Sequence, residues 1–420
     1  MSKWTKTTLG KIADIITGPF GSQLHQSDYV KRGIPIVMPQ DIGNRNINYS
    51  TINYVSEEDA TRLKRYSTVT NDILYARRGD VEKHAFVRAK DAGVLCGTGC
   101  LRVRINSNEV ESAFLSFYLN REETRKWLVT HAVGTNMPNL NTDILSDVPI
   151  AYPTLKEQRK IVKVLNCLEE RIVLNEKIND NLEQQLTTLY DYWFTQFDFP
   201  NENGKPYQSS GGKMVMNNCL KKKIPNGWNV ESVYSNQLSS IIKPGVDKFD
   251  TKTYFATADI KGTSLSSGTL IDYENRENRA NMQPNVNSVW FAKMKNSIKH
   301  FYLNEEMLPI ISNSILSTGF CGLQCSDVSF EYMASYISNT YFETHKDMLA
   351  HGATQEAVNN DDLAGIHIVI PDDKTLQNYH RITQPIYSQI SKNICENQEL
   401  VKIRDWLLPM LMNGQATISD

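Results

Sequence analysis

Apolar residues in the first third of the chain form short runs that Gly, Pro and Asn interrupt. Strands bounded by turn residues are predicted at GIPIVMPQDI, NDILYARRGD and TGCLRVRI. A helix is predicted at SAFLSFYLNREETRKWLVTH, where the apolar residues recur at helical spacing. Residues 1–153 are therefore expected to form a mixed α+β globule.

A long helix is predicted over residues 154–198. Thr154 and Glu157 match a capping box, and no Gly or Pro follows before Pro200. Apolar residues then recur at heptad spacing: Ile161, Leu165, Leu168, Ile172, Leu182, Leu186, Leu189 and Trp193. Asn175 and Asn179 occupy seam positions that should be apolar. Such asparagines lower stability but fix the register and the partner of a coiled coil.

The same order of elements follows a second time. After a Gly-, Ser- and Lys-rich connector at 199–224, residues 225–371 combine predicted strands (TYFATADI, NSVWFAKM, LPIISNSI) with a helix at FEYMASYISNTYFETHKDML. A second coiled-coil helix is predicted over 372–413, less regular because Pro385 interrupts it, and a tail follows at 414–420.

The two halves are copies of one unit. Residues 134–153 align without gaps with 352–371, an offset of 218, and the alignment continues to Leu189 and Leu407. At this offset Asn175 and Asn179 fall on Asn393 and Asn397. One inserted residue would rotate the apolar seam by about 100°. The fold class is therefore α+β with an internal repeat, and a duplicated chain usually does one thing twice.

Charge and composition limit the classes of function that the chain can have. The net charge of −2, from 45 basic and 47 acidic residues, argues against a sequence-independent nucleic-acid coat. Between Arg62 and Arg104, however, ten Lys and Arg stand against four Asp and Glu. This cluster fits a local phosphate footprint or, alternatively, a solvated charged face. No apolar run approaches the roughly 20 residues of a membrane helix, and no signal-peptide pattern is present, so we expect a cytoplasmic protein.

The sequence contains few motifs that are typical of enzymes. It contains no phosphate-binding G-x-x-x-x-G-K-[ST] loop, no H-E-x-x-H and no Asn/Asp-Pro-Pro-Tyr/Phe element. Asp372-Asp373-Lys374 resembles a nuclease motif, but it lies at a predicted helix start, where acidic residues favour the dipole. The C-x3-C pairs Cys96/Cys100 and Cys321/Cys325 have zinc-like spacing, yet they fall at nearly equivalent positions of two copies. We expect buried thiols, no catalytic residue and no metal.

Recognition chemistry is better represented. NDILYARRGD places Arg77 and Arg78 on a turn after a strand, where arginine suits bidentate contact to guanine or phosphate. The second copy has Lys293 and Lys295 there. A shared scaffold with different polar side chains is what two readers of different DNA sequences need.

Over its whole length the chain resembles type I restriction–modification specificity subunits. The resemblance rests on Trp4 to Ala13, GIPIVMPQDI, DILYARRGD, GTNMPNLNTDILSDVPI followed by P-x-x-x-E-Q, and NGKPYQSSGGKMV before IPNGW. It implies two target recognition domains, each reading one half of a split, asymmetric double-stranded DNA site. The long helices would pair antiparallel, hold the readers apart and dock two methylation subunits of an adenine methyltransferase, which motor/nuclease subunits join.

The resemblance assigns S-adenosylmethionine, ATP and Mg²⁺ to the partners and no cofactor to this chain. Rival readings are the specificity subunit of a system with a fused methyltransferase–nuclease partner, a self-contained nuclease or methyltransferase, and a pure protein scaffold. The residues expected to contact DNA are Gly18, Phe20, Ser22, Gln23, Arg77, Arg78, Lys83, His84, Thr98, Thr135, Asn136, Lys293, Lys295, Lys299, His300 and Thr318.

Overall fold

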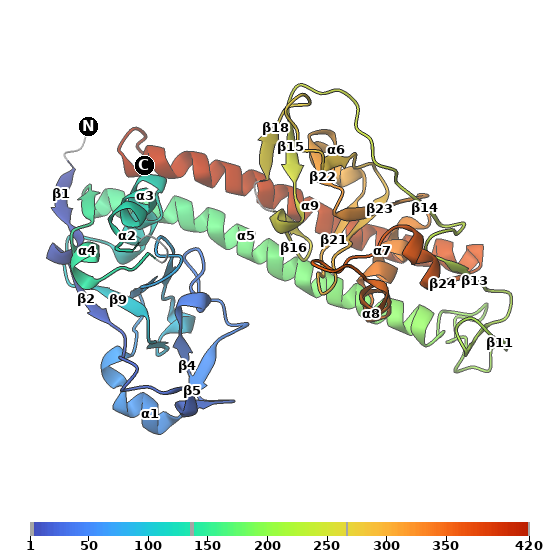
Figure 1. Ribbon diagram of the computed structural model, residues 1–420, viewed down its shortest axis with the longest axis horizontal. Helices are drawn as coiled ribbons and strands as arrows, with labels where there is room; N and C mark the ends of the chain where they lie inside the picture. Colours follow the sequence, from blue (N-terminus) through green and yellow to red (C-terminus); the bar gives the residue numbers. More distant parts are fainter. Residues whose placement is uncertain (1–3, 135–137, 266–267, 419–420) are drawn as a thin grey trace. The chain divides into compact units, whose positions relative to one another are not determined.

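The computed structural model describes residues 4–134, 138–265 and 268–418 (Figure 1). The chain forms two compact units: unit 1 is Met1–Glu169 with Lys402–Asp420, and unit 2 is Glu170–Val401. The boundaries between the units fall inside the two long helices. Each globule therefore includes segments of both helices, whereas the sequence suggested globules and helices as separate domains.

Unit 1 contains two four-stranded sheets and a terminal strand pair. The first sheet has the order β2-β9-β6-β7, with β2 Ala13–Thr17, β9 Cys100–Ile105, β6 Ile73–Ala76 and β7 His84–Phe86. The second has the order β3-β5-β4-β8, with β3 Tyr29–Val30, β5 Asn53–Val55, β4 Ile34–Val37 and β8 Leu95–Cys96. In the second sheet β4 and β8 are parallel. The predicted strands at β4, β6 and β9 are confirmed.

Unit 2 repeats the first sheet of unit 1 and three neighbouring strands of its second sheet. One sheet has the order β14-β23-β20-β21, with β14 Ser239–Ile241, β23 Phe320–Cys325, β20 Ser288–Ala292 and β21 His300–Leu303. The other has the order β18-β15-β22-β19, with β18 Thr269–Ile271, β15 Lys252–Phe255, β22 Ser314–Ser317 and β19 Ala280–Met282. Strands β15 and β22 are parallel, as β4 and β8 are in unit 1.

A two-stranded ribbon leads into each long helix. In unit 1, β1 (Thr5–Thr8) pairs with β10 (Pro149–Tyr152); in unit 2, β13 (Asn229–Ser232) pairs with β24 (His367–Ile370). Thr5 lies opposite Tyr152 and Asn229 opposite Ile370, and Tyr152 and Ile370 are 218 residues apart. The internal repeat of the sequence is therefore a repeat of topology and register.

Two predicted helices are broken in the structure. The first divides into α2 (Ser112–Leu119) and α3 (Glu122–His131), and the second into α7 (Phe330–Ser338) and α8 (Thr340–Leu349). Arg121 and Asn339, at the breaks, adopt extended backbone angles, and the Asn339 side chain caps α8 by accepting the Tyr341 N–H. Asparagine favours such a cap because its oxygen satisfies an N–H that the helix leaves unpaired.

The predicted strand LPIISNSI is wrong in its first half. Its first five residues form α6 (Leu308–Ser312), and β22 begins only at Ser314. Pro309 lies in the first turn of α6, where the missing N–H costs nothing. The remaining short elements are α1 Glu57–Arg62, α4 Thr142–Ser146, β16 Ile260–Lys261, β17 Ser264–Leu265 and the connector hairpin of β11 Met214–Asn217 with β12 Lys222–Pro225.

The long helices are α5 (Leu155–Tyr190), which a π-helical turn extends to Thr195, and α9 (Asp373–Met412). At the start of α5, the Thr154 N–H donates to Glu157 Oε2 over 3.2 Å, as the capping box predicts. Helix α9 continues through Pro385, so the predicted interruption is wrong. Pro385 removes one backbone hydrogen bond, but burial of Tyr387 and Ile390 in the unit 2 core holds the helix together.

The asparagines of the seam pair across the two helices within unit 2. Asn175 Nδ2 donates to Asn397 Oδ1 over 2.9 Å, and Asn393 Nδ2 donates to Asn179 Oδ1 over 2.8 Å. Residue numbers fall on one helix as they rise on the other, so the helices are antiparallel. Asn393 is the repeat equivalent of Asn175, and Asn397 is that of Asn179. The pairs therefore cross over, and a local two-fold axis relates them. The predicted antiparallel coiled coil is confirmed here.

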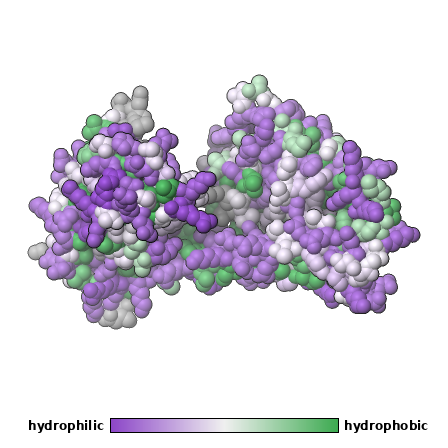
Figure 2. All heavy atoms as spheres, turned by 90° about the horizontal axis from the view of Figure 1, so that it is seen from below, coloured by the Kyte–Doolittle hydropathy of each residue, from purple (hydrophilic) through white to green (hydrophobic). Residues whose placement is uncertain are grey.

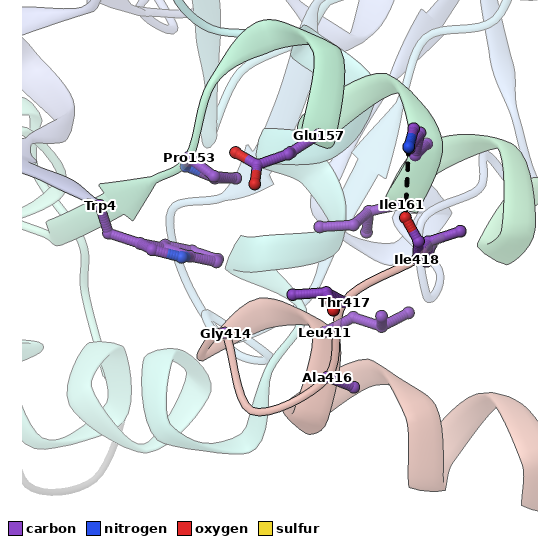
Figure 3. Close-up of a pocket in the computed structure, with 10 residues that line it drawn as sticks. Trp4, Pro153, Glu157, Ile161, Leu411, Gly414, Ala416, Thr417 and Ile418 are labelled. Carbon is purple, nitrogen blue, oxygen red and sulfur yellow. Dashed lines mark hydrogen bonds between the residues drawn. The ribbon is translucent and has the colours of Figure 1, made fainter. Parts of the chain in front are cut away.

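The C-terminal tail completes the core of unit 1. Leu408 and Leu411 of α9 pack in one apolar cluster with Ile161 and Leu165 of α5. Figure 3 shows the following residues turning back beside Trp4 and the first turns of α5, around a cavity of about 110 Å³. A Cβ on Gly414 would lie 2.9 Å from the Trp4 ring nitrogen, so this turn requires glycine.

Candidate nucleic-acid interface

The same backbone frame holds a cationic residue in each unit. In unit 1, the Arg77 N–H donates to the Gly99 carbonyl (2.7 Å), and the Arg77 carbonyl accepts the Leu140 N–H (2.8 Å). In unit 2, the Lys293 N–H donates to Gly319 (2.9 Å), and its carbonyl accepts the Val358 N–H (3.0 Å). These paired hydrogen bonds fix the strand end, the neighbouring turn and the loop before α4 or its counterpart. We call this arrangement the cation frame.

Other candidate segments of unit 1 lie against the cation frame. The Gly18 N–H donates to the Cys100 carbonyl over 2.9 Å, and Arg78 forms a β-bridge with Asn139. A Cβ on Gly18 would lie only 2.0 Å from the Gly97 carbonyl oxygen, so only glycine permits this approach. The structure thus brings together the loop after β2, the Arg77–Arg78 turn and the β8–β9 turn.

Exposure differs among the candidates in these segments. The Phe20 ring is 60% exposed, and Ser22, Gln23 and Arg78 are also exposed. The Gln23 side chain accepts a hydrogen bond from Tyr66 Oη over 2.8 Å, which limits its freedom. Thr135 and Asn136 lie outside the described residues.

Two polar side chains of the unit 1 frame have buried atoms without a partner. Arg77 Nε and Thr98 Oγ1 make no hydrogen bond within the described part of the chain. Buried polar atoms are nearly always paired, so unpaired ones need an explanation such as a missing ligand. In unit 2, Lys293 and Thr318 are half-buried at the corresponding positions.

The remaining lysine candidates already have partners within the protein. Lys83 pairs with Asp80, Lys295 with Glu356 (2.8 Å), and Lys299 Nζ donates to the Thr257 carbonyl. Other members of the basic cluster pair as Arg62 with Asp59, Arg104 with Asp72 and Arg88 with Glu169. These carboxylates neutralise part of the local positive charge, so the charge footprint is narrower than the residue count predicts.

The two histidine candidates are corrected by the structure, because both side chains are buried. His84 Nε2 lies 2.9 Å from Ser116 Oγ, and His300 Nε2 lies 2.8 Å from Glu343 Oε1. Burial, with the positive charge of Arg45 nearby, lowers the pKa of His84 to about 3. Both histidines point into the globules, so they cannot contact DNA directly.

Sequence reasoning missed Arg45, which is 3% exposed. Its Nε donates to Ser116 Oγ (2.9 Å), its NH1 pairs with Glu169 Oε1 (2.5 Å), and its guanidinium lies 3.3 Å from the centre of the Phe117 ring. Burial lowers the pKa of Arg45 to about 10, although Glu169 opposes this shift. A lone arginine in GNRNI carries no sequence signal that distinguishes it from a solvated turn residue.

The cysteines are free thiols. Cys96, Cys100, Cys321 and Cys325 are buried, and burial raises the pKa of each. Cys96 and Cys100 flank a turn, whereas Cys321 and Cys325 both lie in β23, so the pairs are not at equivalent positions. Within residues 4–134, 138–265 and 268–418, no group of three or more His, Cys, Asp or Glu side chains could hold a metal ion.

Hydrophilic residues predominate on the face that Figure 2 shows, and apolar residues form small groups among them. No helix of the described chain is long and apolar enough to cross a membrane. The two units share most of their topology, and each holds a cationic residue in the same backbone frame.

Comparisons with known proteins show what the chain is similar to. Residues 1–184 match the family model for the type I restriction modification DNA specificity domain. The MjaIX specificity subunit of a type I restriction enzyme from Methanocaldococcus jannaschii is 25% identical over 434 residues, covering 98% of this chain and 93% of that protein. The HindI specificity subunit from Haemophilus influenzae is 21% identical, covering 99% and 100%.

A solved structure shares the fold. The type I restriction–modification S subunit of M. genitalium superimposes with a TM-score of 0.52 at 14% identity, covering 100% of this chain and 97% of that one. The chain is thus similar over nearly its whole length to type I restriction enzyme specificity subunits, and residues 1–184 match the DNA specificity domain of that family.

Proposed function

We propose that this chain is the DNA sequence-recognition subunit of a type I restriction–modification complex, in which each unit reads one half of a bipartite asymmetric target. The cation frame is the observation that carries this proposal. Equal backbone hydrogen bonds hold Arg77 in one unit and Lys293 in the other. Equal scaffolds with different side chains give two readers with different targets.

The two cations differ in what they can recognise. Arginine presents a planar fork that matches O6 and N7 of guanine, whereas lysine is a point charge suited to one acceptor or a phosphate. A bidentate pair discriminates against a wrong base by roughly 1–3 kcal/mol.

The frame is tested in the complex of this chain with its methylation subunits. Arg77→Ala should lower the methylation rate on the cognate duplex by about tenfold or more and relax discrimination at one position of one half-site. Lys90→Ala, at an exposed lysine of the same unit outside the frame, is the control. Equal discrimination by the Arg77→Ala and Lys90→Ala complexes on duplexes with single base changes would remove Arg77 from the reading surface.

The outer faces of the long helices support a docking role. Leu174 and Ile178, one turn apart on α5, are 48% and 37% exposed, and Ile403 and Trp406 are exposed on α9. Exposed apolar side chains grouped on a helix mark protein interaction sites. In this proposal they bind two methylation subunits, and the partners hold S-adenosylmethionine, ATP and Mg²⁺ while this chain has no catalytic residue.

Co-purification tests the docking surface. The double variant Leu174→Asp/Ile178→Asp should lose a methylation subunit from the complex during size-exclusion chromatography, because buried charges without partners are unfavourable. Leu270→Asp, at a leucine of β18 that is 72% exposed, makes the same chemical change away from the long helices and should leave assembly unchanged. Full assembly of the double variant would show that methylation subunits dock elsewhere.

A further inference from the structure

Unit 2 contains a cavity of about 210 Å³ that lies apart from the cation frame and has both polar and apolar walls. It lies between the globule of unit 2 and the long helices. Its lining consists of Glu183, Leu186, Thr187, Gly262, Thr263, Ile298, His300, Tyr302, Ser335, Ser338 and Tyr387.

In unit 1, the equivalent space is filled by the side chain of Arg45. Ile42 bridges to Ile47 around Arg45, and Ile260 pairs with Leu265 around Thr263, so the two loops correspond at the 218-residue offset. Arg45 therefore has Thr263 as its counterpart. Four residues around Arg45 also have counterparts in the cavity wall: His84, Phe86, Phe117 and Glu169 correspond to His300, Tyr302, Ser335 and Tyr387.

In unit 1, the equivalent space holds a buried guanidinium group. The Arg45 guanidinium donates to a serine hydroxyl, pairs with the Glu169 carboxylate and stacks 3.3 Å above an aromatic ring. The side chain is almost fully buried. A buried guanidinium is stable only when a carboxylate and further acceptors surround it.

Unit 2 also has a carboxylate at this loop, but no cation. Thr263 Oγ1 donates to Glu183 Oε1 over 2.9 Å, so the carboxylate again meets this loop, although it comes from a different position of α5. Burial raises the pKa of Glu183, because nothing nearby compensates its charge fully. The described lining contains no Lys or Arg, and His300 is engaged with Glu343. Tyr302 and Tyr387 supply aromatic walls. The Ser335 hydroxyl is hydrogen-bonded to Tyr387 Oη over 2.9 Å and the Ser338 hydroxyl to Tyr302 Oη, and a hydroxyl oxygen can accept a further hydrogen bond.

We infer that this cavity of unit 2 is a binding site for a guanidinium cation, either an arginine side chain of a partner protein or a small free cation. A guanidinium fits better than an ammonium because it is planar, stacks on aromatic rings and distributes its donors among several acceptors. Thr263 leaves the space that the arginine fills in unit 1.

Isothermal titration of the full chain with ethylguanidinium chloride, at constant ionic strength, tests the site. We expect saturable binding of one cation, at least about tenfold tighter than ethylammonium chloride. Glu183→Gln should weaken binding by about tenfold or more. Thr263→Arg should abolish binding, because its own guanidinium would occupy the cavity as Arg45 does. Thermal unfolding checks that both variants fold. If the Thr263→Arg variant does not fold, the Glu183→Gln variant alone tests the site.

Absence of saturable binding to the folded chain would overturn the inference, as would equal affinity for ethylammonium or full affinity in the Glu183→Gln variant. This result is independent of DNA reading and of the proposed function. The source of the cation is then tested in the complex with methylation subunits, an arm that does rest on the proposed function. Ethylguanidinium binding that disappears on assembly identifies a partner arginine, and binding that persists identifies a free cation.

Discussion

The buried asparagine pair of the helix seam should behave as one energetic unit. Asn179 and Asn393 are 8% and 3% exposed, and one amide donates to the other over 2.8 Å. Replacing either one by leucine leaves one buried polar atom, Asn393 Nδ2 or Asn179 Oδ1, without its partner, which costs about 1–3 kcal/mol. Replacing both removes two polar groups and joins two leucines in an apolar seam. The double variant should therefore be no less stable than the natural chain, with a coupling energy of roughly 2 kcal/mol or more.

Amide hydrogen exchange of α5 peptides spanning residue 179 is the appropriate assay, because a chain with two units need not unfold in one step. Each single variant should speed exchange there by about tenfold, since 1.4 kcal/mol is a tenfold change in the opening equilibrium. Asn181→Leu, at an exposed position of the same helix, should change exchange little. Additive effects of the Asn179→Leu and Asn393→Leu substitutions would refute this reasoning.

Three further outcomes follow from unit 1. Because the pKa of His84 is about 3 when folded and about 6.5 when unfolded, the unfolded state binds more protons between these values. The free energy of unfolding should then fall by about 1.4 kcal/mol per pH unit below 6.5 in urea titrations, and His84→Gln should remove this slope. Glu169→Leu should destabilise unit 1 by about 3–5 kcal/mol in thermal unfolding, because it leaves Arg45 buried and unpaired, whereas adding Arg45→Met should restore most of the loss. Gly18→Ala should weaken cognate DNA binding by the complex in filter assays, since its Cβ meets the Gly97 carbonyl; unchanged affinity would separate this loop from the interface.

The long helices and the repeat could be predicted because periodicity constrains them strongly. A heptad seam tolerates no inserted residue, so the 218-residue offset survives in the sequence, where it relates Asn175 to Asn393 and Asn179 to Asn397. In the structure these equivalent asparagines pair crosswise, Asn175 with Asn397 and Asn179 with Asn393. The break between α2 and α3 could not be predicted from the sequence, because arginine, which lies at the break as Arg121, is a good helix former. Pro385 carries a strong signal that tertiary packing overrides.

The sequence indicated which segments meet around Arg77, but it did not indicate which side chains in them are buried. Glycines and turn residues located the segments that meet around Arg77, because those residues are required by geometry. Burial depends on contacts distant in sequence, so the sequence could not show that His84 points into the core. The same limit hid Arg45, whose partner Glu169 lies 124 residues away.

The central claim is that each unit reads its own half of the target. Residues 1–153 would be exchanged for the corresponding segment of another family member with a different target, and methylated bases would be mapped genome-wide by long-read sequencing. We predict that one half-site changes, while the other half-site and the spacing between them stay the same. An unchanged target, or a change in both half-sites, would contradict the account.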